Sequence, residues 1–319
     1  MAEKSSEKSP IVVYGAITAN FIIAVSKFVA AVFTGSSAML SEGIHSAADT
    51  GNQCLILLGL NRSKKPADEQ HPFGHGQELY FWSLIVAIVL FGLGGGLSIY
   101  EGIVHIQHPG TLESPIWNYV VLGIAFVSEG TTWLLALREM LHQKKPDESF
   151  WQTLHRSKDP SIYTVLGEDT AALLGILVAF LGVFLGSRLQ MPVLDGVASL
   201  IVGIILVIIA AFLAYESKGL IVGESTDMDV VKQVRQIAQS DPAVDEVNGI
   251  LTMHFGPNDV LLNMDIGFRS NLPAAEVATA VDRLESNIRE EAPLIKRIFI
   301  EAEALKQKSR KSAQDGSST

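Results

Sequence analysis

The chain has 319 residues, of which 48% are hydrophobic and only 18% are charged. Soluble proteins carry closer to a quarter charged residues, so the composition argues against an ordinary soluble protein. The 34 acidic residues against 24 basic ones argue against a nucleic-acid partner. A single cysteine, Cys54, excludes a disulfide framework and a thiolate metal site.

Six apolar runs predict six transmembrane helices, because roughly twenty helical residues span the hydrocarbon core of a bilayer. The runs lie at 11–33, 38–60, 80–103, 116–138, 162–187 and 195–216. Segment 1–10 is polar, and the first run is too long for the hydrophobic region of a signal peptide. We therefore expect a cytoplasmic N-terminal segment, 1–10, followed by a six-helix transmembrane domain, 11–216.

Basic residues in the short loops indicate the orientation, since lysine and arginine are concentrated in cytoplasmic loops. One side of the predicted bundle carries ten of them, whereas the other side carries only Arg188. The ten are Lys4, Lys8, Arg62, Lys64, Lys65, Arg138, Lys144, Lys145, Arg156 and Lys158. Both termini are expected in the cytoplasm, in a multi-pass protein of the cell (inner) membrane.

Beyond Glu216 the composition becomes that of a soluble domain. Apolar residues recur at helical spacing from Val230, alternate as in strands over 245–255 and 259–268, and recur at helical spacing again from Val277. A last strand is expected from residue 295 to residue 300. The order αββαβ predicts a small sheet with helices on one face over residues 217–305. The polar tail, 306–319, is expected to be disordered.

Ionisable side chains inside apolar helices are costly, so they indicate a function or a partner. The second apolar run contains His45 and Asp49, which are four residues apart and therefore share one helix face. An imidazole and a carboxylate so placed form half of a tetrahedral site for a borderline-soft metal ion. The alternative is a His–Asp hydrogen bond that only holds helices together.

The fifth run supplies two adjacent carboxylates, Glu168 and Asp169, followed by the small residues Ala171 and Ala172. Small residues allow helices to pack closely, and the carboxylates offer oxygen ligands. The alternative is that this stretch lies at the cytoplasmic interface of the membrane, where acidic residues cost little.

The loop after the second run holds Asp68, His71 and His75 within eight residues, in a stretch bent by proline and glycine. These are three potential metal ligands in one short loop. Ordinary solvated polarity is the alternative explanation.

The remaining polar residues of the helices receive simpler interpretations. Lys27 and Glu129 are expected to be interhelical partners or proton-path groups and not metal ligands. His105 and His108 flank an external loop and are expected to be solvated. The glycines between Gly92 and Gly96 predict close helix packing and not a phosphate loop, since no strand precedes them.

Taken together, these features resemble the cation diffusion facilitator family over nearly the full length of the chain. The shared motifs are Thr34-Gly35-Ser36, His45 with Asp49, the loop from Asp68 to Gly76, Leu194-Asp195-Gly196 and the stretch 219–224. The resemblance implies a homodimer, alternating access, exchange of metal for protons, and a metallochaperone-like cytoplasmic domain.

The resemblance also implies ligands at individual positions. His45 and Asp49 match the transport-site pair on the family's second helix. Asp68, His71 and His75 match the family's second site, near the junction of the membrane and cytoplasmic domains.

On the fifth helix the family usually has His-Xaa3-Asp, and this sequence departs from that pattern. Alignment on Ala171 and Ala172 places Glu168 at the aspartate position and Thr164 at the histidine position. Glu168 is therefore the preferred ligand, and Asp169 is the second candidate, in a register one residue later.

These assignments leave a difference in depth to be explained. Asp49 lies ten residues from the outer end of its predicted helix at Met39, and Glu168 lies eighteen from Gly186. At about 1.5 Å per residue the depths are roughly 15 and 27 Å. The two can meet only if the fifth helix projects or tilts and begins upstream of Ser161.

The resulting hypothesis is a zinc/proton antiporter that exports Zn²⁺ from the cytoplasm. His45 binds metal only when neutral, so proton and metal compete for one nitrogen. The imidazole favours Zn²⁺, whereas Thr164 beside two acids shifts the preference toward Mn²⁺, Fe²⁺ or Co²⁺. An enzyme is not expected, because no His-Glu-Xaa-Xaa-His motif is present. A metal-sensing or scaffolding membrane protein without transport remains the alternative.

Overall fold

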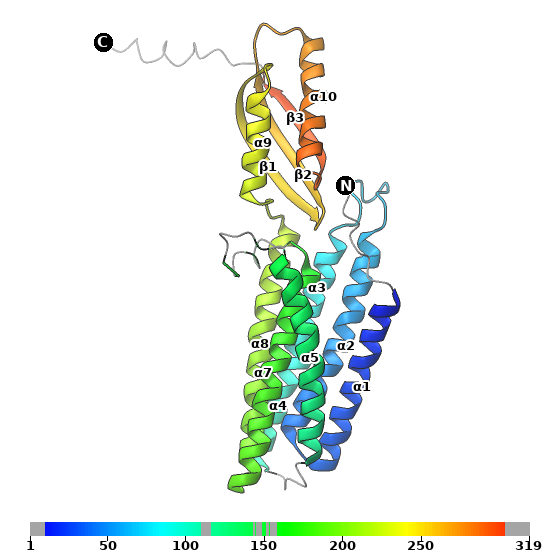
Figure 1. Ribbon diagram of the computed structural model, residues 1–319, viewed down its shortest axis with the longest axis vertical. Coiled ribbons are helices and arrows are strands. Elements are labelled where there is room, and N and C mark those ends of the chain that lie inside the picture. Colours follow the sequence, from blue (N-terminus) through cyan, green and yellow to red (C-terminus); the bar gives the residue numbers. More distant parts are fainter. Residues whose placement is uncertain are drawn as a thin grey trace, which may run out of the picture. The chain divides into compact units, whose positions relative to one another are not determined.

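The computed structural model describes residues 10–109, 116–142, 144, 149, 150, 153 and 158–303. The contacts divide the chain into two compact units (Figure 1). The first unit comprises the chain up to Pro66 together with Gln77–Ile221, and the second comprises Ala67–Gly76 together with the chain from Val222 onward. The loop that follows the second helix is therefore part of the same compact unit as the C-terminal domain.

The described part of the first unit contains six long helical segments, and each extends past its predicted apolar run. They are α1 (Pro10–Thr34), α2 (Ser37–Ser63), the continuous series α3 (Glu78–Val89), η1 (Leu90–Gly96) and α4 (Leu97–Gln107), α5 (Ile116–His142), α7 (Pro160–Leu189) and α8 (Val193–Val222). Four stretches are long and apolar enough to cross a membrane, namely Glu78–Gln107, Ile116–His142, Ile162–Leu189 and Val193–Val222. With α1 and α2 they make up the helical bundle of the first unit. Helix α2 is less apolar because it carries many polar side chains.

Glycines allow α4 and α8 to pack backbone against backbone. A Cβ atom at Gly102 would lie 2.6 Å from the Leu200 nitrogen and 2.9 Å from the Gly196 carbonyl oxygen, which is too close for any residue but glycine. The π-helical η1 continues this contact, since a Cβ atom at Gly95 would lie 2.6 Å from Val207 Cγ2. Such close packing holds membrane helices together, because lipid tails are as apolar as the side chains and leave little hydrophobic driving force.

The second unit has the αββαβ order that the sequence predicts. It contains α9 (Met228–Ser240), β1 (Val244–Gly256), β2 (Asp259–Phe268), α10 (Ala274–Glu291) and β3 (Ile295–Glu303). The strand order is β1-β2-β3, with β1 antiparallel and β3 parallel to β2. The parallel pair needs a long crossover, which α10 supplies.

Alternation along β2 places the core of this unit on one face of the sheet. Val260, Leu262, Met264 and Ile266 are fully buried, and the residues between them are partly exposed. The buried side chains form one cluster with α9 and α10 through Val234, Ala238, Ala280, Leu284 and Ile288. Both helices therefore cover the same face, as the pattern predicts.

An ion pair outside the bundle yields the first prediction. Arg283 on α10 donates from Nε and Nη2 to the buried Asp241 carboxylate at 2.7 Å each. These bonds hold the pKa of Asp241 below its ordinary value. The stabilisation is therefore complete above the ordinary aspartate pKa and is lost as the pH falls through the lower folded value.

We expect Arg283→Gln to lower the stability of the second unit at neutral pH, and by more than a substitution in a helical surface pair, because the Asp241 carboxylate loses its charged donors. Hydrogen exchange of α10 and β1 in the full chain measures the change. Arg289→Gln is the control, since Arg289 pairs with Glu285 one turn away on the same helix and such a pair contributes only about 0.2–0.5 kcal/mol. Equal effects of the two substitutions, or an effect that persists undiminished in acid, would contradict this account.

Candidate metal centres

His45 and Asp49 lie on α2 in the interior of the bundle, with exposed fractions of 0% and 8%. His45 Nδ1 is 3.4 Å from Asp49 Oδ1, longer than an ordinary N–H···O hydrogen bond. Three buried atoms of this pair have no hydrogen-bond partner within the described residues, namely both ring nitrogens of His45 and Oδ1 of Asp49. Buried polar atoms rarely lack partners, so this pair is better suited to binding an ion than to holding helices together.

Glu168 of α7 reaches the same side of α2. Its Oε1 accepts a 2.6 Å hydrogen bond from Asn52 Nδ2. Asn52 is fully buried and lies seven residues after His45, so the two share one face of α2. The α2–α7 contact therefore brings together an imidazole, two carboxylates and an amide. Sequence reasoning missed Asn52, although a polar residue two helical turns from His45 was an available signal.

The polar side chains of α7 near Glu168 do not all point toward α2. Thr164, one turn before Glu168, is buried, and its hydroxyl has no hydrogen-bond partner among the described residues. Asp169 Oδ2 likewise has no hydrogen-bond partner among the described residues. Thr170 accepts a 3.0 Å hydrogen bond from Trp133 Nε1 of α5. Glu168 is thus directed toward α2, whereas the α7 surface two residues later is directed toward α5.

The predicted offset in depth between the second and fifth helices disappears because α7 projects beyond the start of α2. Asp195, near the start of α8, accepts hydrogen bonds from Ser37, the first residue of α2. A Cβ atom at Gly182 would lie 3.7 Å from Asp195 Cα, so Gly182 is level with that start. Fourteen residues separate Glu168 from Gly182, and fifteen separate Ser37 from Asn52. Equal helical rise then brings Glu168 and Asn52 to one depth.

A buried ion pair attaches α1 to the same helix. The ammonium group of Lys27 is fully buried and donates to Glu42 Oε2 at 2.9 Å and to Ser46 Oγ at 2.8 Å. Lys27 is thus an interhelical partner, one of the two roles expected for it. Sequence reasoning assigned no role to Glu42, although it lies three residues before His45. Removing one partner of such a pair is strongly destabilising.

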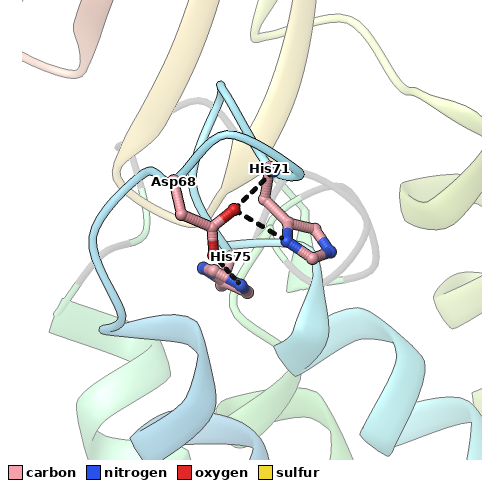
Figure 2. A group of neighbouring side chains, drawn as sticks. All are labelled: Asp68, His71 and His75. Atoms are coloured by element: carbon pink, nitrogen blue, oxygen red, sulfur yellow. Dashed lines mark hydrogen bonds and ion pairs between the residues drawn. The ribbon is translucent and has the colours of Figure 1, made fainter.

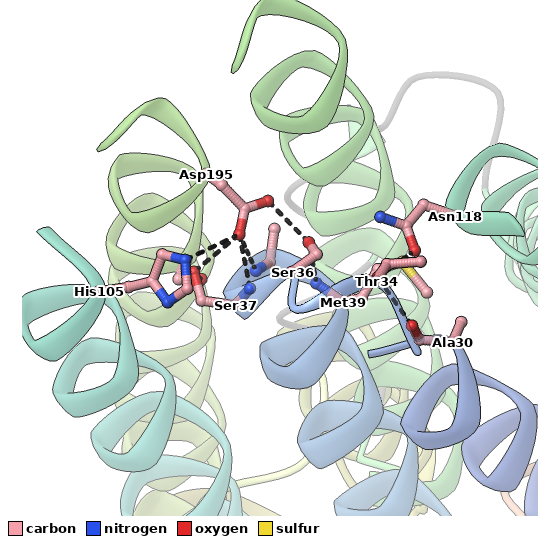
Figure 3. A network of polar contacts seen from close by, with 10 residues as sticks. Ala30, Thr34, Ser36, Ser37, Met39, His105, Asn118 and Asp195 are labelled. Carbon is pink, nitrogen blue, oxygen red and sulfur yellow. Dashed lines mark hydrogen bonds and ion pairs between the residues drawn. The ribbon is translucent and has the colours of Figure 1, made fainter. Parts of the chain in front are cut away.

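A second buried network lies where α2 and α8 begin (Figure 3). The Asp195 carboxylate accepts hydrogen bonds from Ser36 Oγ, from the nitrogen and hydroxyl of Ser37, and from the Ala38 nitrogen. The expectation that His105 is solvated was wrong. Its side chain is only 17% exposed and its Nε2 lies 3.9 Å from Asp195 Oδ2, because the close packing of α4 on α8 carries the ring inward.

The loop residues Asp68, His71 and His75 form a cluster within the second unit (Figure 2). Their ligand atoms all lie within 4.8 Å of one another. His71 Nδ1 is 3.1 Å and His75 Nε2 is 3.6 Å from the Asp68 oxygens. Ligand atoms around tetrahedral zinc are about 3.3 Å apart, given its bond lengths. Small side-chain rotations would therefore bring all three onto one ion.

A tight turn fixes the carboxylate of Asp68. The backbone nitrogens of His71 and Gln70 donate to Asp68 Oδ1 at 2.6 and 3.0 Å. The hydrogen bond from the His71 backbone is the main cause that lowers the pKa of Asp68 below its ordinary value. The carboxylate is therefore ionised at neutral pH, which is the form that binds a metal.

The loop is attached to the sheet by residues that sequence reasoning missed. Arg297 of β3 donates to the Phe73 carbonyl oxygen at 2.7 Å, and its guanidinium lies over the rings of Phe73 and Phe255. A Cβ atom at Gly76 would lie 2.1 Å from the Phe255 carbonyl oxygen, so the loop backbone rests directly on β1. The sheet thus determines where the cluster is held.

Comparison with known proteins identifies the family of the chain. A family model described as the cation efflux transmembrane domain matches residues 13–222. The chain is 38% identical over 258 residues to the Xenopus laevis protein named proton-coupled zinc antiporter SLC30A9, mitochondrial, covering 81% of this chain and 46% of that protein. It therefore spans about half the length of that relative.

Two more distant relatives are matched over larger shares of their length. The metal tolerance protein C4 of Arabidopsis thaliana is 27% identical over 94% of this chain and 75% of its own length. The magnetosome protein MamB of Paramagnetospirillum magneticum is 24% identical over 88% of this chain and 90% of its own length.

We expect the loop cluster to hold one Zn²⁺ per chain. His71→Ala and His75→Ala should each weaken that binding by at least about tenfold, as measured by calorimetry on the full chain. Glu69→Ala, an exposed acid in the same loop, is the matched control and should leave binding unchanged.

We also expect residues 217–305 alone, which lack the loop, to bind little or no zinc. His254 is the only histidine there, and it is buried with Nδ1 3.1 Å from the Gly256 carbonyl oxygen. Calorimetry that found a micromolar or tighter zinc site in this fragment would refute the expectation.

Proposed function

The chain belongs to the cation efflux, or cation diffusion facilitator, family, and we propose that it is a zinc/proton antiporter that exports Zn²⁺ from the cytoplasm. The family is one of transporters, and the chain is a multi-pass membrane protein and not an enzyme. We propose further that it acts as a homodimer in the cell (inner) membrane with both termini in the cytoplasm.

The observation that carries the proposal is the meeting of α2 and α7 inside the bundle. His45 and Asp49 are buried on α2, and Glu168 of α7 is bonded to Asn52 on the same α2 face. One imidazole nitrogen with carboxylate oxygens is a ligand set that Zn²⁺ accepts in tetrahedral geometry. Buried ionisable groups in a membrane bundle are retained where an ion or proton must pass.

The coupling to protons follows from the same ligands. A metal ion binds the neutral imidazole and the ionised carboxylate, so each ion that enters displaces any proton held there. Protons arriving from the opposite side compete for His45 and Asp49 and promote release. One site that holds either metal or protons, opened alternately to the two sides, is sufficient for exchange.

One feature of α7 favours a broader range of metals. Thr164 stands one turn before Glu168 where the family usually has histidine, so α7 contributes oxygen and no nitrogen to the proposed site. Oxygen ligands suit Mn²⁺, Fe²⁺ and Co²⁺ better than a second imidazole does. These ions are the second candidate substrates, and Asp68, His71 and His75 would hold a further metal ion on the cytoplasmic side.

His45→Ala and Asp49→Ala should each abolish metal flux into proteoliposomes under a proton gradient, because each removes a proposed metal ligand. His108→Ala, an exposed histidine at the end of α4, is the control and should leave flux intact. Uptake of Zn²⁺, Mn²⁺, Fe²⁺ and Co²⁺ in parallel identifies the substrate. Flux comparable to wild type in either variant would sink the ligand assignment, and metal binding without flux would favour a sensor or scaffold.

The register on α7 is tested separately. Glu168→Ala should damage transport far more than Asp169→Ala, because the two side chains leave the helix about 100° apart and only Glu168 contacts α2 in the hydrogen bonds described. Thr164→His should restore the commoner ligand set and tighten zinc binding. Severe loss in Asp169→Ala with a mild effect of Glu168→Ala would place the ligand one residue later.

A further inference from the structure

The first turn of α2 is hydrogen-bonded to a side chain of another helix. The Asp195 carboxylate of α8 is fully buried and accepts from Ser36 Oγ at 2.7 Å, from Ser37 Oγ at 3.0 Å, and from the backbone nitrogens of Ser37 and Ala38. Ser199 of α8 donates to Ser37 Oγ at 2.9 Å. An ionised carboxylate has about four acceptor positions. Three of the four donors converge on Oδ2, which exceeds the two acceptor positions of that oxygen, whereas Oδ1 accepts only from Ser36 Oγ.

His105 faces Asp195 Oδ2 within ion-pair distance (Figure 3). Its Nε2 is 3.9 Å from Asp195 Oδ2, beyond hydrogen-bond distance, and has no hydrogen-bond partner within the described part of the chain. Protonation converts that nitrogen into a charged donor. Because Oδ2 already accepts three hydrogen bonds from α2, the new donor can bond to that oxygen only by displacing one of them.

The surroundings contain few other charges. Asp195 is the single ion-pair partner of His105 among the described residues. Glu101 lies one turn earlier on α4, and Arg188 at the end of α7 is exposed and lies over Phe184. The first ionisable residue along α2 is Glu42, which is paired with Lys27. A change of charge on His105 therefore acts mainly on Asp195.

We propose that Asp195 is the positioning residue for α2. We propose also that protonation of His105 weakens the hydrogen bonds that the first turn of α2 donates to Asp195. The network lies where α8 begins, at the opposite end of α8 from the chain's continuation into the C-terminal domain. With the proposed orientation, this is the side from which protons enter. The consequence for transport rests on the proposed function, because α2 carries His45 and Asp49; the protonation-dependent contact itself does not.

Hydrogen exchange in the detergent-solubilised full chain tests the proposal directly. The amides of Ser37 and Ala38 report whether Asp195 still accepts from them. After correction for the intrinsic pH dependence of exchange, we expect their protection to fall at least about tenfold from pH 7.5 to pH 5.5, the interval in which histidine changes charge. Protection that stays constant, or that rises in acid, would overturn the proposal.

Matched variants distinguish a protonation-dependent contact between His105 and Asp195 from a merely structural role of the two residues. His105→Gln removes the ionisable ring, and Asp195→Asn keeps an acceptor for the amides but removes the charge that attracts an imidazolium. Both should make the protection independent of pH, and the double variant should add nothing further. His108→Gln, three residues later and just after the end of α4, should retain the wild-type fall. A fall that persists in His105→Gln, or that disappears in His108→Gln, would contradict the assignment to His105. Since flux is not measured, failure of the proposed transport activity would leave this test intact.

Discussion

Most of the buried polar side chains of α2 are held by partners on other helices, and these contacts organise the membrane unit. Unsatisfied polar groups in hydrocarbon are costly, yet α2 buries a histidine, two acids and an asparagine. The partners come from three other helices. Asp195 of α8 binds the first turn, Lys27 of α1 binds Glu42, and Glu168 of α7 binds Asn52.

These three attachments lie at successive depths along one helix, and they leave the atoms between them unused. The imidazole of His45 and one oxygen of Asp49 lie between the Lys27 and Glu168 attachments without hydrogen-bond partners among the described residues. A helix so closely held positions its remaining polar atoms precisely enough to bind an ion, because ligand geometry tolerates only small displacements. The same attachments must rearrange if α2 is to open alternately to the two sides.

The second unit holds in place the short loop that contains the candidate ligands Asp68, His71 and His75. A loop of ten residues has little structure of its own, so its geometry depends on what it contacts. Here Arg297 and Phe255 of the sheet bind its backbone and the ring of Phe73, and internal hydrogen bonds to Asp68 orient the ligand. The C-terminal sheet, which lacks a ligand cluster of its own in the described residues, thus supports one contributed by a segment far away in sequence.

The sequence by itself determined the elements and the candidate ligands. Hydropathy and alternation are local properties, so the six apolar helices and the αββαβ order were predicted closely, and His45 with Asp49 could be placed on one face from their spacing alone. Only the tertiary structure decided which groups meet. Asn52 and Glu168 are 116 residues apart, and Ser37 and Asp195 are 158 apart. Whether such side chains touch depends on the rotation and relative depth of whole helices. That arrangement is set by contacts such as Gly102 on Gly196 and by the projection of α7 past the start of α2, which no local pattern records. His105 was misjudged for the same reason: its neighbours in sequence suggest a solvated loop end, and only helix packing carries its ring to Asp195.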